Sequence, residues 1–220
     1  MLLSFDTATP QVTAALADGD QVLAERVADR ALKHGEQLAP LLEAVLADAG
    51  AVRQDVTAIA VGVGPGPFTG LRVGLMTART LGFVLDVPVY GVCSLDVLAV
   101  EAADTGVVTG AVTGAPGEGF VVATDARRKE VYLASYDDSG TRLSGPVVAR
   151  PADAATTAPV VGEGAVLYPD SFPTAVGPQR PSAGWLARVV AGERAELLDP
   201  EPLYLRRPDA EAPGARKPVS

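Results

Sequence analysis

Residues 57–85, TAIAVGVGPGPFTGLRVGLMTARTLGFVL, combine a short apolar run, a loop rich in glycine and proline, and a longer segment that is again largely apolar. The composition of Thr57–Val63 is typical of a buried central strand. We expect the loop to end at Thr69, an N-cap candidate, and a helix to run from Gly70 to Leu85. Strand, loop and helix in this order indicate an α/β fold.

The segments before this stretch extend the alternation of strands and helices. Leu2–Thr7 is a short apolar run that leads into turn residues, as at the end of a strand. Val12–Leu16 and Gln21–Val27 flank the sequence Asp-Gly-Asp at 18–20, which is a good hairpin signal. The first three strands are therefore expected to form a β-meander.

The clearest helical pattern follows this meander. Apolar residues recur at helical spacing and define one face of the expected helix: Leu38, Leu41, Leu42, Val45, Leu46 and Ala49. Gly50 suits the position just after the helix. Pro40 removes one backbone donor, so we expect the helix to begin late or to bend there.

The rest of the chain predicts a second, smaller domain. The expected elements are a strand at 87–92, a helix at 94–103 with Ser94 as N-cap, strands at 120–125, 130–136 and 145–149, and a helix at 182–191. Between Thr105 and Gly119 the composition shifts to small residues and proline, which is typical of a linker. We expect an N-terminal domain at 1–104, a C-terminal domain at 105–207 and a disordered tail at 208–220.

Composition and charge restrict the function. The chain has 220 residues, a net charge of −9 and one cysteine, Cys93, which excludes an internal disulfide. Proteins that grip nucleic acid unaided normally carry a basic face, and the only dense basic cluster here is 127–129. We therefore expect a partner to supply most of the binding if the function involves RNA. With no signal-peptide pattern and no long apolar run, we expect a cytoplasmic protein.

The end of the first strand is a candidate ligand site. A carboxylate followed by small hydroxyl residues can hold Mg²⁺ and offer backbone N–H groups to phosphate, and Asp6, Thr7 and Thr9 have this arrangement. The alternative is that these residues only build a turn. Ala8 favours the turn, because a loop that surrounds phosphate closely usually needs glycine there.

The loop at 62–70 is not a Walker phosphate loop. It lacks the Lys-Ser/Thr pair, and Pro65 and Pro67 remove two backbone donors, so we interpret it as a rigid connector. The helix after it carries small residues at a spacing of four: Gly70, Gly74, Ala78 and Gly82. This stripe predicts close packing against another helix, either 38–49 of the same chain or a helix of another chain.

Two other features have both a functional and a structural interpretation. His34 is the only histidine, and without companion ligands we expect it to start a helix rather than to act in catalysis. Asp125, Arg127 and Glu130 lie between two expected strands. They form either a triad that faces a ligand or a hairpin turn with exposed charges, and the second arrangement is the commoner one.

Six blocks of the sequence carry a resemblance to a known family. They are residues 5–9, His34 with 38–42, 64–74, 91–95, 125–132 and 201–206, and they cover nearly the whole chain. Together they resemble the signature blocks of the bacterial TsaB (YeaZ) family, and 64–74 is the most specific. The resemblance implies an actin-like (ASKHA, ribonuclease H-like) fold of two related α/β domains with mixed sheets.

The resemblance also implies partners. The family works with TsaD, the transferase that places threonylcarbamoyl on the tRNA adenosine next to the anticodon, and the ATPase TsaE joins them. Contact through helices 34–49 and 70–85 is implied, both with TsaD and in a homodimer of the isolated subunit. The expected interface residues are His34, Leu38, Leu41, Leu42, Val45, Gly70, Leu71, Gly74, Leu75 and Ala78.

The family's transferase paralogue carries a histidine pair on the helix that corresponds to 94–103, and this chain has none there. The resemblance therefore implies a scaffold subunit with no metal site and no cofactor of its own, ATP or ADP and a divalent metal belonging to the partner or the interface. The alternative is an autonomous actin-fold ATPase or kinase that uses Asp6, Thr7 and Thr9. A peptidase that depends on His34 has the least support.

Overall fold

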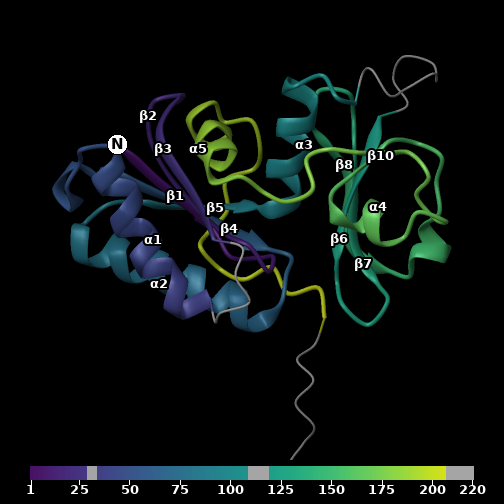
Figure 1. The fold of residues 1–220 in the computed structure, drawn as a ribbon, viewed down its shortest axis with the longest axis horizontal. Coiled ribbons are helices and arrows are strands. Elements are labelled where there is room, and N and C mark those ends of the chain that lie inside the picture. Colours follow the sequence, from purple (N-terminus) through teal and green to yellow (C-terminus); the bar gives the residue numbers. More distant parts are fainter. Residues whose placement is uncertain (29–33, 109–118, 207–220) are drawn as a thin grey trace, which may run out of the picture.

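The computed structural model describes residues 1–28, 34–108 and 119–206. Its strands are β1 (Leu2–Asp6), β2 (Val12–Asp18), β3 (Gln21–Ala28), β4 (Ala58–Gly64), β5 (Val89–Cys93), β6 (Phe120–Asp125), β7 (Val131–Tyr136), β8 (Arg142–Ala149), β9 (Val160–Val161) and β10 (Ala175–Val176). Its α-helices are α1 (His34–Asp48), α2 (Phe68–Leu85), α3 (Ser94–Asp104), α4 (Glu163–Leu167) and α5 (Ala183–Ala191). These elements form two lobes that lie side by side in Figure 1.

Each lobe contains one five-stranded sheet, and both sheets have the same topology. In the first sheet the order is β3-β2-β1-β4-β5, with β1, β2 and β3 antiparallel and β4 and β5 parallel to β1. In the second the order is β10-β9-β6-β7-β8, with β6, β7 and β8 antiparallel and β9 and β10 parallel to β6. This repeat confirms the predicted fold class, an actin-like α/β fold of two related lobes.

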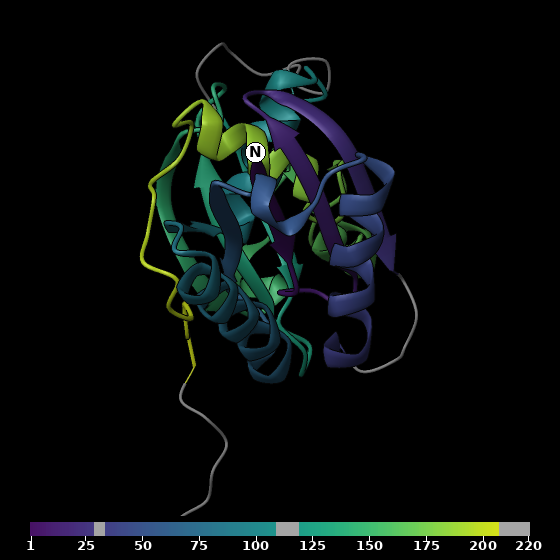
Figure 2. The ribbon, with the colours of Figure 1, turned by 90° about the vertical axis from the view of Figure 1, so that its left-hand side faces the viewer.

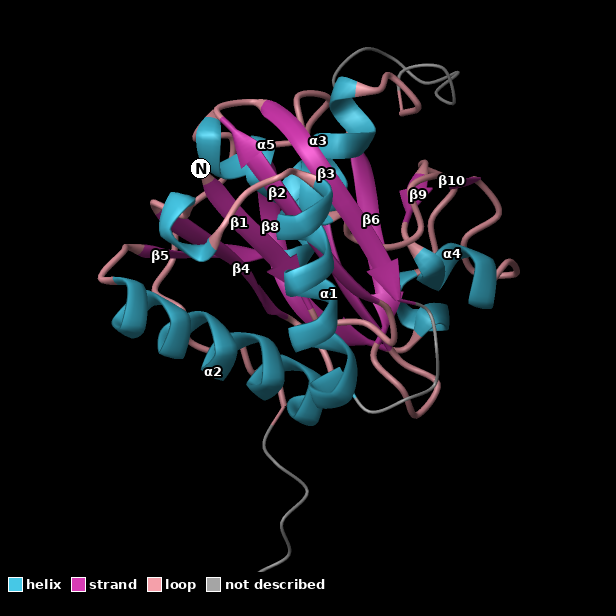
Figure 3. Ribbon diagram, turned by 60° about the vertical axis from the view of Figure 1, so that its left-hand side comes forward, coloured by secondary structure: helices cyan, strands magenta, loops and turns pink. Residues whose placement is uncertain are grey.

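Helices α1 and α2 cover one face of the first sheet, as Figures 2 and 3 show. Side chains alternate along a strand, so Leu3 and Phe5 of β1 pack in one apolar cluster with residues of both helices. Ser4, between them, points to the other face, where its hydroxyl group donates a hydrogen bond of 2.7 Å to the carbonyl oxygen of Ala183. The central strand is therefore buried on both sides.

The other face of the first sheet is covered by α3 and α5, although α5 comes from the C-terminal half of the chain. Ala60 and Val92 of the sheet share a buried cluster with Val97 of α3 and Leu186 of α5. Helix α5 begins after Ser182, whose hydroxyl group accepts a hydrogen bond from a backbone N–H of the first turn. A helix from the C-terminal half of the chain thus packs directly on the sheet of the N-terminal half.

Helix α3 lies between the two sheets. Its residues Leu95 and Leu98 share a second buried cluster with Phe120 and Val122 of β6. The far face of the second sheet is covered by α4 and its flanking segments, in a smaller cluster around Phe172. The layers of the molecule are therefore α1 with α2, the first sheet, α3 with α5, the second sheet, and α4.

Most expected strands and helices are present within a few residues of their predicted limits, and three details are corrected. Helix α1 begins at His34 and includes Pro40, so it does not begin late; Pro40 is exposed, where water can satisfy the carbonyl group that the proline leaves unbonded. Helix α2 begins at Phe68, with Pro67 and not Thr69 at the N-cap. Ser94 is the first residue of α3, and the N-cap is Cys93.

Strands β9 and β10 and helix α4 were not predicted. Most of the expected linker and the whole expected tail lie outside the described residues, so the domain limits at 104/105 and 207/208 stay predictions. None of the helices in the described ranges is both long enough and apolar enough to span a bilayer.

Candidate functional site

The carboxylate of Asp6 lies at the centre of the first lobe and is engaged on both oxygens. Its Oδ1 accepts a hydrogen bond of 2.6 Å from the backbone N–H of Ala8, and its Oδ2 accepts one of 2.6 Å from the hydroxyl group of Ser94. Burial raises the pKa of Asp6, while these two hydrogen bonds act in the opposite direction. The serine predicted as a helix cap is used here instead, to hold the carboxylate.

The turn that follows Asp6 is packed closely against neighbouring backbone. The hydroxyl group of Thr7 donates a hydrogen bond of 2.8 Å to the carbonyl oxygen of Gly70. A Cβ atom at Gly62 would lie 1.8 Å from Oδ2 of Asp6, and one at Gly66 would lie 2.2 Å from the carbonyl oxygen of Ala8. The glycines of the loop therefore allow protein, rather than ligand, to approach the turn, which supports the structural interpretation of Asp6, Thr7 and Thr9.

The other chemically reactive groups do not gather into a site. Cys93 is fully buried, and burial raises the pKa of its thiol to about 12, so it is a poor nucleophile. The described residues contain no group of three or more His, Cys, Asp or Glu side chains placed to hold a metal ion. The side chain of His34 lies outside the described part of the chain.

The residues expected at a partner interface lie mainly in the core of the first lobe, which corrects that expectation. Leu38, Leu42, Val45, Leu71, Leu75 and Ala78 belong to its main apolar cluster, Gly70 and Gly74 are buried, and Leu41 is partly buried. The small-residue stripe of α2 faces the sheet and not α1: a Cβ atom at Gly74 would lie 2.4 Å from Oγ1 of Thr7, and one at Gly82 would lie 2.3 Å from Cγ2 of Val89.

Helix α2 has a second apolar face, which is exposed. Met76, Phe83 and Val84 are 59%, 89% and 68% exposed, and the exposed residues Arg72 and Arg79 lie among them. Next to this face, a groove of about 560 Å³ runs between α1 and α2, lined among others by Leu42, Leu46, Leu81 and Leu85. The exposed side chains of this face are not among those that the family resemblance implied for the interface.

Of the two arrangements considered for Asp125, Arg127 and Glu130, the structure has the hairpin turn between β6 and β7, and the three side chains do not form one cluster. Asp125 pairs with Arg127, whose Nη1 lies 3.2 Å from Oδ2 of the carboxylate. Glu130 instead forms an ion pair with Arg206, from the segment after α5, and Arg206 also donates a hydrogen bond of 3.0 Å to the carbonyl oxygen of Ala126. Arg206 was missed as a site residue because it lies far away in sequence.

Comparison with known proteins places the chain in a family. The family model described as "TsaD: tRNA N6-adenosine threonylcarbamoyltransferase" matches residues 21–171. A Bacillus subtilis protein named "tRNA threonylcarbamoyladenosine biosynthesis protein TsaB" is 32% identical over 136 residues, 61% of this chain and 54% of that protein. The solved structure of "YeaZ from Pseudomonas aeruginosa" is 28% identical, with a TM-score of 0.73, and covers 93% of this chain and 99% of its own. The chain belongs to the TsaB (YeaZ) family.

An uncharacterized protein of Mycobacterium tuberculosis resembles this TsaB-family chain along nearly its whole length. It is 44% identical over 214 residues, which cover 95% of this chain and 93% of that protein.

The fold brings five of the six TsaB-like blocks together at two places. Blocks 5–9, 64–74 and 91–95 meet around the Asp6 carboxylate, through Ser94 and the loop glycines. Blocks 125–132 and 201–206 meet through the ion pair of Glu130 and Arg206. In this TsaB-family chain, these five blocks thus build the centre of the first lobe and the junction of the second lobe with the C-terminal segment.

Proposed function

We propose that this chain is the non-catalytic subunit that binds and activates the transferase TsaD in the biosynthesis of threonylcarbamoyladenosine in tRNA. Its TsaB and YeaZ relatives support a role in this biosynthesis. The observation that carries the finer proposal is the exposed apolar face of α2, formed by Met76, Phe83 and Val84 beside the α1–α2 groove. Large exposed apolar side chains that gather on one helix face beside an apolar groove mark a candidate interaction site.

The chemistry of this face fits a helical partner. An apolar stripe on one helix, next to a groove against a second helix, is the arrangement that accepts another amphipathic helix. Complete burial of a side chain such as Phe83 would contribute about 1.5–3 kcal/mol. The matching family model is that of the transferase itself, so a partner of related fold would bring an equivalent pair of helices to the contact.

The Asp6 turn supports the non-catalytic part of the proposal. Both oxygens of the Asp6 carboxylate accept hydrogen bonds from the protein, and the turn is packed against Gly62 and Gly66. Coordination of Mg²⁺ by Asp6 would require the carboxylate to give up these bonds. We therefore propose that ATP or ADP and a divalent metal belong to the partner or to the subunit interface and not to the Asp6 turn, and that this chain requires no cofactor of its own.

The proposal includes the other expected partners: TsaE, tRNA and a second copy of this chain. TsaE and the tRNA join through TsaD, and the isolated chain forms a homodimer through the same face of α2. In the homodimer this face would be occupied by the second copy, so homodimer and TsaD complex exclude each other. The net charge of −9 is consistent with tRNA held mainly by another subunit.

Reconstituted threonylcarbamoyl transfer to tRNA tests the proposal. The cognate TsaD and TsaE are supplied with the adenylate donor and tRNA, with this chain present or omitted, and ATP hydrolysis by the chain alone is measured in parallel. We expect transfer only when the chain is present, and no hydrolysis by the chain alone. Full transfer without the chain would contradict the proposal, and hydrolysis that is lost in Asp6→Asn would establish the ATPase alternative.

A further inference from the structure

The exposed face of helix α2 alternates apolar and basic side chains. Its exposed members follow one another at spacings of three or four residues, which places them on one side of the helix. We call this set the α2 stripe: Phe68, Arg72, Met76, Arg79 and Phe83. Helix α2 contains no Asp or Glu residue, and the two arginines are its only charged side chains. The stripe is therefore basic, in a chain whose net charge is −9.

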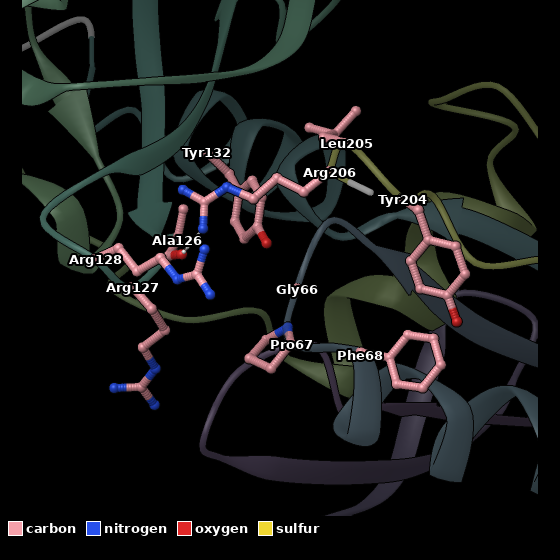
Figure 4. Close-up of a pocket in the computed structure, with 10 residues that line it drawn as sticks. All are labelled: Gly66, Pro67, Phe68, Ala126, Arg127, Arg128, Tyr132, Tyr204, Leu205 and Arg206. Carbon is pink, nitrogen blue, oxygen red and sulfur yellow. Dashed lines mark hydrogen bonds between the residues drawn. The ribbon is translucent and has the colours of Figure 1, made fainter. Parts of the chain in front are cut away.

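Both arginines of the α2 stripe can still take a carboxylate partner. Among the residues that the structure describes, neither is paired with a carboxylate. The guanidinium group of Arg72 lies 4.3 Å from the centroid of the Phe68 ring, and this ring is stacked with that of Tyr204, with centroids 5.3 Å apart (Figure 4). Stacking uses the flat face of the guanidinium group, so the N–H groups in its plane remain able to donate.

A partner that covers the apolar members of the stripe also covers the arginines. Met76 lies between Arg72 and Arg79 along the helix, so a surface that buries Met76 and Phe83 removes water from both guanidinium groups. An unpaired charge in such a contact is costly, whereas a carboxylate at hydrogen-bond distance offsets the loss of water. The arginines are seven residues apart, which is about 10.5 Å along the helix axis. The stripe therefore fits an amphipathic helix that carries carboxylates about two turns apart.

A second copy of this chain matches the apolar part of the stripe but not its charges. When two copies of one helix pack antiparallel about a two-fold axis, residues at equal distances on opposite sides of the axis face each other. With the axis at the middle of the stripe, Phe68 faces Phe83 of the second copy, and Arg72 faces Arg79 of the second copy. Like charges then meet at two symmetric positions, and such pairs suppress association.

We propose that Arg72 and Arg79 determine which partner the α2 stripe accepts: they favour a helix that carries carboxylates and disfavour a second copy of this chain. The identity of the favoured partner rests on the proposed function, in which TsaD supplies this helix. Because the homodimer and the TsaD complex use the same face, the two arginines shift the balance between them towards the complex.

The carboxylates of α1 provide a competing arrangement. Glu36 and Glu43 are exposed and also seven residues apart. If α1 of a second copy lay on the α2 stripe, the arginines would stabilise the homodimer instead of weakening it. The two arrangements therefore predict opposite effects when the arginines are removed.

Mixing the wild-type chain with the charge-reversed variant Arg72→Glu/Arg79→Glu tests the charge argument without TsaD. The variant serves as a partner whose α2 carries carboxylates and is otherwise unchanged. Native mass spectrometry distinguishes the mixed dimer from the two homodimers. We expect the mixed dimer to exceed the share for random pairing, because opposite charges face each other only there. A mixed dimer that is absent, or that stays at or below the random share, would overturn the proposal.

The neutral variant Arg72→Gln/Arg79→Gln measures the effect on each complex. Binding to immobilised TsaD is recorded at chain concentrations well below the dissociation constant of the homodimer, so that dimerisation does not compete, and sedimentation equilibrium gives that constant. We expect the affinity for TsaD to fall about tenfold or more and the homodimer to become about threefold tighter or more. Arg150→Gln, which changes an exposed arginine of the other lobe, is the matched control and should alter neither affinity.

The outcomes separate this inference from the proposed function. Unchanged affinity of the neutral variant for TsaD, or a weaker homodimer, would overturn the inference, and the second result would favour the arrangement with α1. A wild-type chain that does not bind TsaD at all would contradict the proposed function, and the mixed dimer would then still decide the role of the arginines. Both positions are exposed, and glutamine and glutamate are good helix formers, so the variants should fold.

Discussion

At the scale of single residues, the Asp6 carboxylate determines which side chains its neighbours can have. It is buried, it accepts hydrogen bonds from Ala8 and Ser94, and Gly62 lies directly beneath it. A buried carboxylate is costly unless its oxygens are satisfied. Protein atoms therefore fill the space around the Asp6 carboxylate, and a methyl group added at Gly62 would have to displace it.

Gly62→Ala should destabilise the protein strongly. The added Cβ would lie 1.8 Å from Oδ2 of Asp6, so the carboxylate would have to move away from Ser94. We expect a loss of about 2–4 kcal/mol in the free energy of unfolding, measured by urea denaturation. Gly35→Ala is the control, because its Cβ would only touch Val73 at 3.9 Å, and alanine in helix α1 should stabilise slightly. Equal stability of the Gly62→Ala and wild-type proteins would show that the carboxylate is not confined.

Glu101 gives the protein a predictable pH dependence. Burial, with the neighbouring Glu25 carboxylate, raises the pKa of Glu101 from 4.5 to about 7, while Arg188 acts in the opposite direction. Because the folded state binds the proton more tightly than the unfolded state, this group should reduce stability as the pH rises from about 4.5 to about 7. Thermal unfolding of Glu101→Gln should show a smaller loss over this range, and a melting temperature a few degrees above that of the wild type at pH 8. Parallel pH profiles for the two proteins would rule out the effect.

At the scale of elements, α2 shows what the sequence could and could not predict. Helical spacing identified the helix and its stripe of small residues, but it did not tell which neighbour the stripe meets. That depends on tertiary contacts with Thr7 and Val89. The interface residues implied by the family resemblance are therefore mostly buried, and the exposed apolar residues of the opposite face, such as Phe83, were not considered.

The same limit applies elsewhere in the fold. Long strands with an apolar composition, such as β4 and β6, were recognised, whereas β9 and β10 have two residues each and contain no period to detect. Ser94 follows the usual rule for a helix cap, yet its hydroxyl group donates to Asp6, 88 residues away. The contact between the β6–β7 turn and the C-terminal segment likewise depends on Arg206, whose partner Glu130 cannot be identified from local spacing.

Phe83→Asp should weaken the association with TsaD without unfolding the chain. The ring is 89% exposed, so the substitution removes few contacts within the subunit and places a charge on the proposed interface. We expect affinity to fall about tenfold or more, measured by calorimetry with purified TsaD, and transfer to fall with it. Val166→Asp, which changes an exposed apolar residue of α4 in the other lobe, is the control. Unchanged affinity of a folded Phe83→Asp protein would exclude this face as the interface.

At the scale of the whole molecule, the first sheet depends on both halves of the chain. Its strands all come from residues 2–93, but one of its faces is covered by α5, at 183–191. Glu25 of β3 reinforces this contact, because it accepts hydrogen bonds from the hydroxyl group of Ser182 and the backbone N–H of Gly184. The lobes are therefore not independent in the way that the boundary at 104/105 suggests.

A fragment of residues 1–108 should not fold by itself, although it contains the complete first sheet. Without α5, the face of the sheet that includes Ala60 and Val92 would be exposed to solvent. We therefore expect the fragment to bind a hydrophobic dye and to unfold without a cooperative transition. Co-expression with a fragment of residues 119–206 should restore a cooperative transition in urea. A cooperative transition of the first fragment alone would show instead that the lobe is self-sufficient.

The position of α5 also affects how the protein is made. A ribosome releases β1 to β5 long before it reaches residues 183–191, so every nascent chain passes through a period in which one side of its first sheet has no cover. Apolar surface exposed during synthesis is what chaperones recognise. The first sheet should therefore be fully covered only after α5 has been released, and a chaperone that binds nascent chains should hold the chain until then.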